Sequence, residues 1–459
     1  MKKTLIWLVA IIVVVSMAMF VGIGCKTTAA AEETTAAAEE TSAAEETTAA
    51  GEKVTINFWH ANSETVEGPP TARIIEAFNE EYPEIEVVMS YDATLDKVLA
   101  TVTAGNPPDI FTWWGPQFVG SWAFTGALEP LDDIISKEKI DLEDTLPVLN
   151  STTLNGKVYG MPFGTDISML YYNVDSFIAA GLDPNDPPET IAELLEYAEK
   201  LTVVEGGEIK QLGWLPNYGW THVGGDGSIP VRFGAPFFKE DGSAAFDDPR
   251  WIDVFNFAKW PFEKYGFENV QLFIASFGEY GTAQDPLATG QLAMIYDGEW
   301  RAAQMANNCP DLNYNIVTFP YSEIYPENAT EHQMGGTTIV IPSTAPQKEA
   351  AGKLLAFMLR PENIAEFCYD PGLGNVPSSY GALALYDQYK DQQPEMYKYF
   401  IDLSQSVDPI SIPASPISDE MFTELGRVEE LIYSGKVDVE TGLADLQETL
   451  TGIYQEKVK

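Results

Sequence analysis

LNGKVYGMPFGTDISMLYYN, residues 154–173, contains two short extended runs with a break between them. The run 157–161 leads into Pro162-Phe163-Gly164, and the apolar, aromatic run 167–172 can be buried on both faces. Proline lacks a backbone donor and glycine weakens a strand, so a ladder cannot run straight through this break. We therefore expect the chain to cross between two α/β lobes at 163–167. The alternative is an ordinary edge-strand kink within one sheet.

Strand and helix patterns alternate on both sides of this stretch. The clearest helix is 190–202, where Thr190 and Glu193 form a capping box ahead of a buried apolar stripe. Strands that alternate with helices indicate parallel β-α-β units, so the expected fold class is α/β. The expected strands are 53–59, 85–89, 110–113, 211–215, 293–296, 314–319 and 337–341, and the expected helices are 71–81, 95–104, 190–202, 251–264, 300–307 and 347–359, with a mainly helical chain past Pro377.

Length and charge restrict the class of protein. A chain of 459 residues is too long for one ordinary core, so two or more domains are expected. Its 69 acidic and 26 basic side chains give a formal charge of −43, and the first 52 residues hold only seven Glu and three Lys, so the body itself is acidic. Such a surface repels nucleic acid and anionic lipid, which excludes nucleic acid as a partner.

Cysteine and histidine spacing gives no sign of a metal site or another cofactor. The three histidines are scattered, and the cysteines Cys25, Cys309 and Cys368 form no C-x-x-C motif. Cys309 and Cys368 can form a disulfide if the body lies outside the cytoplasm, or they can be buried free thiols. The spacing does not decide between the two.

The first 52 residues are expected to lie outside the fold. Residues 1–25 have two lysines, a long apolar run and Cys25, as in a signal segment, and the ending VGIGC resembles a bacterial lipoprotein box with Gly22 where Leu is usual. We expect lipidation of Cys25; the alternative is an uncleaved membrane anchor. Residues 26–52, almost wholly Ala, Glu and Thr, are expected to be a disordered tether. The body would then be extracytoplasmic and held to the membrane.

The order of motifs in the body resembles the sugar-type (family 1) extracellular solute-binding proteins of ABC importers, which include the maltose-binding-protein-like proteins. The resemblance covers about residues 53–459. It rests on VTINFWHA, FNEEYPEIEV, GNPPDIFTWW with TGALEPLDD, NGKVYGMPFGTDISMLYYN, and GQLAMIYDGEW followed by MGGTTIVIPS. PETIAEL resembles the family's Pro-x-Thr-Trp-Asp-Glu-Leu, with Ile191 in place of Trp.

The resemblance implies a two-lobed fold, each lobe a β-sheet flanked by helices, joined by a multi-segment hinge with the ligand in the cleft. Lobe 1 would be 53–165 plus 320–373, and lobe 2 would be 166–319 plus 374–459. The crossings would fall near 164–166, 318–320 and 374–377, each of which contains Gly or Pro beside an extended run. A monomer is usual in this family.

Ligands of open α/β sheets bind beyond the carboxyl ends of the strands. The candidate ligand contacts are therefore the residues that directly follow the expected strands. Aromatic rings can cover the apolar faces of a sugar, and carboxylates and amides can bond its hydroxyls. Trp300 is the strongest candidate because the resemblance places a sugar-stacking Trp there. Trp214, Trp220 and His222 lie in an aromatic, Gly-rich loop that could line lobe 2 but gives a weaker signal. The expected ligand-binding residues are Trp59, His60, Asn62, Trp113, Trp114, Asp166, Asp297, Glu299, Trp300, Gly335 and Gly336.

Three functional hypotheses follow. The first is a tethered receptor, not an enzyme, that captures a sugar or oligosaccharide and delivers it to the permease subunits of an ABC importer. The second is a secreted glycoside hydrolase with Asp166 and Glu299 as the carboxylate pair. The third keeps the fold and changes the ligand to a peptide or polyamine; scattered histidines argue against a metal.

Overall fold

The computed structural model describes residues 53–459 apart from 62, 221 and 226. The expected signal segment 1–25 with Cys25, the tether 26–52 and the candidate Asn62 lie outside the described residues. Chain contacts separate Met1–Ala50 from Gly51–Lys459, and the account below concerns the second unit. Within the described part, no helix combines the length and the apolar character needed to cross a membrane.

The first of two five-stranded sheets has the order β2-β1-β3-β14-β6. β1 pairs in parallel with β2 and β3, whereas β14 is antiparallel to β3 and to β6. The strands alternate with helices because the apolar period changes from two to 3.6 between them, as the sequence predicts. The strands are β1 (Val54–His60), β2 (Ile85–Ser90), β3 (Ile110–Trp113), β6 (Met161–Pro162) and β14 (Thr338–Val340), and the helices around them are α2 (Gly68–Glu81), α3 (Leu95–Thr103), α13 (Lys348–Met358) and α14 (Pro361–Cys368).

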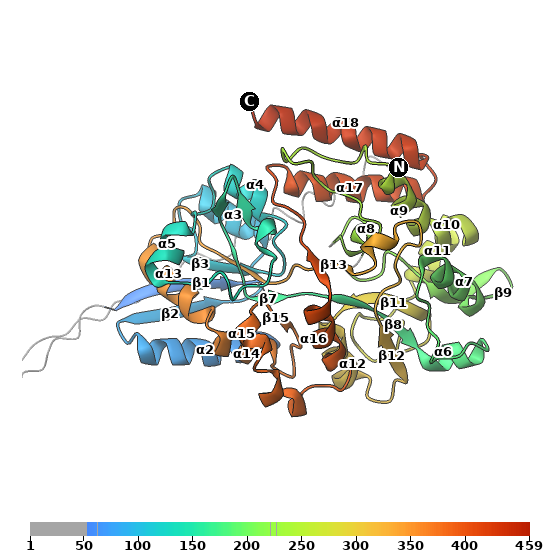
Figure 1. Ribbon diagram of the computed structural model, residues 1–459, viewed down its shortest axis with the longest axis horizontal. Helices are drawn as coiled ribbons and strands as arrows, with labels where there is room; N and C mark the ends of the chain where they lie inside the picture. The colour runs from blue at the N-terminus through green and yellow to red at the C-terminus, as the bar shows by residue number, and fades with distance from the viewer. Residues whose placement is uncertain (1–52, 62, 221, 226) are drawn as a thin grey trace, which may run out of the picture. The chain divides into compact units, whose positions relative to one another are not determined.

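The second sheet has the order β12-β8-β11-β10-β9. Strand β8, between β12 and β11, is buried at all six positions, as expected for the apolar run after the break, and pairs antiparallel with both neighbours. Figure 1 shows β8, β11 and β12 well away from β1, β2 and β3. The strands are β8 (Ser168–Asn173), β9 (Val203–Glu205), β10 (Glu208–Trp214), β11 (Leu292–Gly298) and β12 (Tyr314–Val317), and the helices that follow or cover them include α7 (Ile191–Leu201), α9 (Arg250–Ala258), α10 (Trp260–Tyr265) and α12 (Trp300–Asn308).

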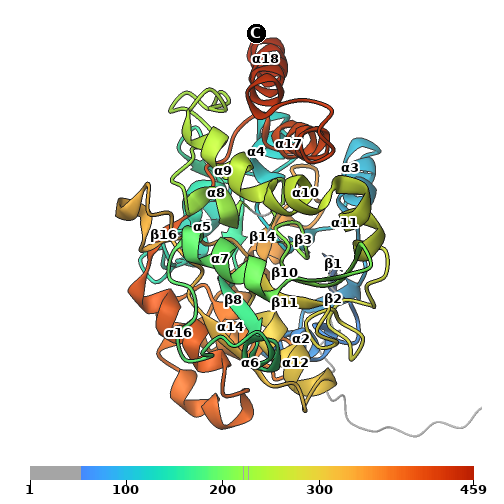
Figure 2. The same cartoon turned by 90° about the vertical axis from the view of Figure 1, so that its right-hand side faces the viewer.

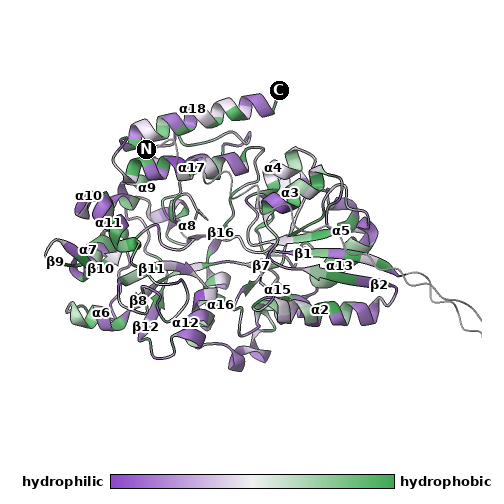
Figure 3. Ribbon diagram, turned by 180° about the vertical axis from the view of Figure 1, so that it is seen from behind, coloured by the Kyte–Doolittle hydropathy of each residue, from purple (hydrophilic) through white to green (hydrophobic). Residues whose placement is uncertain are grey.

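The chain passes from β6 in the first sheet to β8 in the second through the Pro-Phe-Gly break, so this break is a crossing and not an edge-strand kink. Two short strand pairs lie between the sheets (Figures 1 and 3). They are β7 (Gly164–Thr165) with β15 (Val376–Pro377), antiparallel, and β13 (Glu331–Gln333) with β16 (Asp408–Ile410), parallel.

The hydrogen bonds of segment 319–331 do not coincide with the expected crossing to the first lobe at 318–320. Tyr321 bonds the backbone ahead of α7, with its carbonyl accepting from Ile191 N at 2.9 Å. The buried Arg232 guanidinium donates to the carbonyls of Phe319 (2.9 Å), Ala329 (3.1 Å) and Glu331. The segment therefore stays with the second sheet as far as β13, because one buried cation holds its carbonyls there.

The chain past 374, expected to belong to lobe 2 throughout, makes contacts with both halves of the body. Ser379 bonds the Asp144 carboxylate beside the first sheet, whereas Tyr171 of β8 packs against Phe400. The last two helices, α17 (Ser418–Tyr433) and α18 (Val439–Lys457), pack along each other in both views (Figures 1 and 2). α17 also contacts α4 (Val119–Phe124) near the first sheet, and α18 contacts α9 near the second. The C-terminal segment thus serves both halves, and the lobe boundaries stay a prediction.

Local sequence explains some of the helix ends. The capping box of α7 is present, with Glu193 N donating to Thr190 Oγ1 at 3.2 Å. The single helix expected over 251–264 is wrong: it is two helices, α9 and α10, that meet at Lys259, because Pro261 cannot donate a helical hydrogen bond. The other elements are α4 (Val119–Phe124), α5 (Asp132–Glu138), α6 (Val174–Ala179), α8 (Ser228–Val231), α11 (Phe267–Ile274), α15 (Tyr380–Leu383), α16 (Tyr397–Ser406), β4 (Thr153–Leu154) and β5 (Lys157–Val158).

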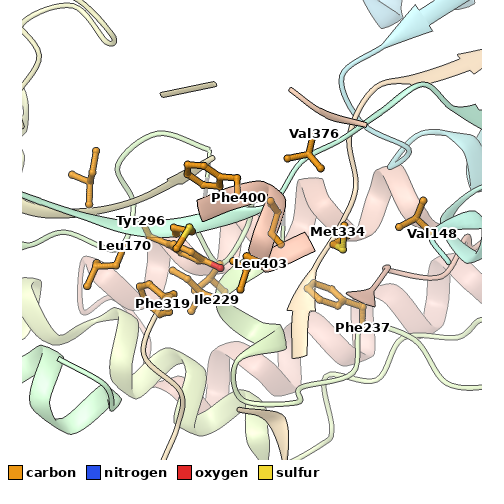
Figure 4. Packing of buried hydrophobic residues seen from close by; sticks show 14 of the residues in the cluster. Val148, Leu170, Ile229, Phe237, Tyr296, Phe319, Met334, Val376, Phe400 and Leu403 are labelled. Atoms are coloured by element: carbon orange, nitrogen blue, oxygen red, sulfur yellow. The ribbon is translucent and has the colours of Figure 1, made fainter. Parts of the chain in front are cut away.

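The main hydrophobic core combines many aliphatic side chains with a set of stacked aromatic rings. Beside the second sheet, the rings of Tyr296 and Phe319 stack with centroids 4.0 Å apart, and Leu170 lies beside them (Figure 4). Buried faces are supplied by amphipathic helices such as α18, along which hydrophilic and hydrophobic residues alternate (Figure 3). Cys309 and Cys368 are both buried free thiols, each directed at a backbone carbonyl, of Thr282 (3.3 Å) and Phe163 (3.7 Å) respectively.

Candidate functional site

A cavity of about 1210 Å³ is lined by residues from both halves of the body. The first sheet contributes Trp113 and Trp114 at the end of β3, and the crossing contributes Asp166. The second half contributes Trp300, the first residue of α12, together with Trp220. The cavity therefore lies where the carboxyl ends of several strands meet, as the rule for open α/β sheets predicts.

Aromatic rings supply much of the lining. Trp113 and Trp114 are adjacent, with ring centroids 5.0 Å apart, and Trp114 is 45% exposed. Trp220 is 61% exposed, whereas the Trp300 ring is partly buried. Large rings left open to a cavity present flat apolar faces that an apolar ligand surface can cover.

The charge of the lining is one-sided. Among the described lining residues are five carboxylate side chains and neither Lys nor Arg; the carboxylates are Glu67, Asp96, Asp166, Asp370 and Asp419. A nearby cation, Arg73, pairs with Asp370 at 2.7 Å and with Glu366. The one histidine of the lining, His222, has its Nδ1 3.0 Å from a carboxylate oxygen of Glu429. The part of the lining that the structure describes thus offers hydrogen-bond acceptors and has no Lys or Arg to clamp an anion.

Two carboxylates share one amide at the crossing. Asn375 Nδ2 donates to Glu299 Oε1 at 3.0 Å and to Asp166 Oδ1 at 3.4 Å, and Ile167 N donates to Glu299 Oε2 at 2.9 Å. Burial, with the neighbouring negative charge of Asp166, holds the pKa of Glu299 well above its usual value. Glu299 is fully buried and does not line the cavity, so its role at this position is to hold the crossing, while Asp166 reaches the cavity.

The structure separates the predicted contacts into two groups. Trp113, Trp114, Asp166 and Trp300 line the cavity together. The others do not appear in its lining; they are Trp59, His60, Asp297, Glu299, Gly335 and Gly336. The set of ligand-binding residues as a whole stays a prediction.

The contacts of the second group explain their positions. His60 is buried among aromatic rings and lies 3.3 Å from Thr71 Oγ1, and burial lowers its pKa to about 3. Trp59 lies beneath the Lys97 ammonium, 4.7 Å from the ring centroid. A Cβ at Gly336 would lie 2.4 Å from the Gly164 carbonyl, so its close approach is to the crossing backbone.

Sequence reasoning missed the contribution of α17 and of two helix N-termini. Asp419 and Phe422 reach the cavity from α17, far along the chain from every predicted contact. Glu67 directly precedes α2, and Asp96 lies in the first turn of α3. No local pattern marks them, because they follow no strand. Tyr280 also lines the cavity and was not predicted. The only signal in the sequence is an aromatic residue between Glu279 and Gly281, outside any expected helix or strand. The described residues contain no cluster of three or more metal-ligating side chains.

Comparison with known proteins identifies the family. The model of a family described as "Bacterial extracellular solute-binding protein" matches residues 73–396, more than half of the chain. The chain belongs to this family. The solute-binding protein is 26% identical over 336 residues to the sn-glycerol-3-phosphate-binding periplasmic protein UgpB of Shigella flexneri, a match that covers 68% of this chain and 72% of the relative. The match to the same-named protein of Escherichia coli K12 has equal identity and coverage.

Solved structures give the same fold. CpMnBP1 with mannotriose bound is similar at a TM-score of 0.76 and 25% identity, over 86% of this chain and 99% of that one. UgpB from Mycobacterium tuberculosis in complex with glycerophosphocholine has a TM-score of 0.68 and 21% identity, over 88% and 99%. The fold of this solute-binding protein is thus the two-lobed α/β periplasmic-binding-protein-like fold that the sequence predicts.

Proposed function

We propose that this solute-binding protein captures an uncharged oligosaccharide in the cavity and delivers it to the permease of an ABC importer. The observation that carries the proposal is the lining itself: exposed tryptophan faces, carboxylates, and neither Lys nor Arg among its described residues. Sugar rings present apolar C–H faces to such rings and hydroxyl donors to such carboxylates. The cavity volume suits more than one sugar residue, since pockets for drug-sized ligands measure about 300–1,000 Å³.

The charge of the lining separates two ligand classes named among the relatives. UgpB proteins are named for sn-glycerol-3-phosphate, and CpMnBP1 was solved with mannotriose. A phosphate group is recognised by arginine or lysine or by a helix N-terminus free of competing anions. The first turn of α12 lies beside the Glu299 carboxyl, and the lining offers five carboxylates. The electrostatics therefore favour a neutral sugar over a phosphorylated ligand.

A thermal-shift panel on the purified protein tests this function. The panel sets mannobiose, mannotriose and other neutral di- and trisaccharides against sn-glycerol-3-phosphate, glycerophosphocholine, peptides and polyamines. A ligand at a hundred times its Kd adds about 2.7 kcal/mol to the free energy of unfolding, enough for a measurable shift. We expect shifts with one group of neutral sugars. A shift with the phosphate compounds and none with sugars would overturn the assignment.

The glycoside hydrolase hypothesis has less support. A hydrolase needs both carboxylates at the scissile bond, but only Asp166 of the proposed pair lines the cavity. The described relatives are named as binding proteins. Release of shorter sugars from a bound oligosaccharide would revive the hypothesis.

The membrane anchor belongs to the same proposal. The family is extracellular, and we assign the retention of this protein at the membrane to lipidation of Cys25, with 26–52 as the tether and a monomeric body. Metabolic labelling with a fatty-acid analogue should mark the wild-type protein and not Cys25→Ser. Equal labelling of both would contradict the anchor.

A further inference from the structure

The indole of Trp300 makes a polar contact with a neighbouring side chain. Its indole Nε1 donates to the hydroxyl of Tyr280 at 2.8 Å. One face of its ring packs on the backbone of Gly298, where an added Cβ would lie 2.1 Å from a ring carbon. A tryptophan that serves as a sugar platform needs a fixed ring plane, because a ring that rotates loses orientation entropy on binding.

The Tyr280 hydroxyl continues into a buried cluster of charges. It donates to Asp297 Oδ2 at 2.9 Å, and the same oxygen lies 3.1 Å from Arg301 Nη2. The Arg301 guanidinium also lies over the Tyr280 ring, 4.1 Å from its centroid, so it fixes both the ring and the carboxylate. Asp297 and Arg301 are fully buried.

Asp285 fastens the other end of this cluster to the backbone. Its Oδ2 accepts from Arg301 Nη1 at 2.8 Å and from Gly281 N at 2.9 Å, and its Oδ1 accepts from Leu287 N at 2.9 Å. Asn308, at the far end of α12, donates to the Gly281 carbonyl at 2.7 Å. The segment that carries Tyr280 is therefore bonded to α12 through Asn308 and to β11, the strand before α12, through Asp297.

We propose that Tyr280, Asp297, Arg301 and Asp285 form a positioning chain that fixes the ring plane of Trp300 and so sets how tightly the cavity holds a sugar. Tyr280 is the link, since its hydroxyl both accepts from Trp300 and donates to Asp297. The cluster buries two carboxylates with one guanidinium, an arrangement that contributes orientation more readily than stability. Asp297, predicted as a direct ligand contact, acts here through Trp300. The sugar part of this inference rests on the proposed function; the orientation of Trp300 does not.

The first test is spectroscopic and needs no ligand. In protein labelled with ¹⁵N-tryptophan, the indole signal of Trp300 is the one lost in Trp300→Phe. Tyr280→Phe removes its acceptor, so we expect that signal to move upfield and its hydrogen to exchange faster with water, while the other indole signals stay in place. Tyr325→Phe is the matched control, because Tyr325 donates to the Asp253 carboxylate at 2.6 Å and does not line the cavity. An unchanged Trp300 signal in Tyr280→Phe overturns the proposal.

The second test is a double-mutant cycle with mannotriose as the probe. Loss of one hydrogen bond should weaken binding about three- to tenfold in Tyr280→Phe. If Tyr280 acts only through Trp300, the same change in a Trp300→Ala background should have no further effect. Additive losses would show that Tyr280 touches the sugar directly and would overturn the positioning role. If the wild-type protein binds no sugar, the proposed function fails, while the indole signal still decides whether the chain orients Trp300.

Discussion

At the scale of single residues, Asp419 should couple folding to pH. It lines the cavity from the first turn of α17, where burial, reinforced by the negative charge of Glu420, raises its pKa from 3.8 to about 7. Between these two pH values the unfolded chain loses this proton and the folded chain keeps it. The free energy of unfolding contributed by this group therefore falls as pH rises from about 4 to about 7, and stays constant above that range.

Asp419→Asn has no carboxyl group to ionise, so it removes the loss of stability that the wild type shows between about pH 4 and pH 7. We expect the variant to be more stable than the wild type at pH 8, by on the order of 2 kcal/mol, and nearly equal to it at pH 4. Urea denaturation at both pH values measures the difference. Glu448→Gln, an exposed change on α18, is the control and should alter stability little at either pH. A gain for Asp419→Asn that is the same at pH 4 and pH 8 would rule out ionisation as its cause.

At the scale of elements, the capping box of α7 should contribute measurably to the free energy of unfolding. Thr190 Oγ1 accepts from Glu193 N at 3.2 Å, and the Glu193 carboxylate accepts from Thr190 N at 3.1 Å. Thr190→Ala leaves the Glu193 amide without its partner, so we expect a loss of about 1 kcal/mol. Chemical denaturation measures it, and Thr190→Ser should restore most of the loss. Equal stability of all three proteins would show that the cap contributes nothing here.

Elements with a strong local signal were predictable. β3 (Ile110–Trp113) has the expected bounds because Pro108 precedes it and its run is short and apolar. The two-residue strands β7 and β15 were not predictable, since their pairing depends on a partner some 210 residues away and not on a local pattern. The contacts of 319–331 were not predictable for a similar reason: Arg232 holds carbonyls of this segment, and no pattern near 320 reveals that contact.

At the scale of the whole molecule, the rule that ligands lie beyond strand ends found part of the site. It selected Trp113, Trp114, Asp166 and Trp300, which the fold brings to one cavity. It also selected His60, which turns inward because residues alternate along β1. It missed Asp419, since α17 reaches the cavity through long-range packing against α4.

Long-range packing also decides the state of the cysteines. Cys309 and Cys368 are both free and face different carbonyls. We expect both thiols to react with a thiol reagent in denaturant, and the count to be unchanged by prior reduction. Burial raises the pKa of both thiols, so neither should react quickly in the folded protein. Two extra thiols that appear only after reduction would contradict the structure.

The most direct measurement of the central claim is titration calorimetry of mannotriose into the wild-type protein, Trp300→Ala and Trp260→Ala. Trp260 lies on α10, outside the cavity lining, and serves as a matched loss of one indole. We predict that Trp300→Ala weakens binding by about 2 kcal/mol, roughly 30-fold, and that Trp260→Ala leaves the affinity unchanged. Equal affinity of Trp300→Ala and the wild-type protein would contradict the account.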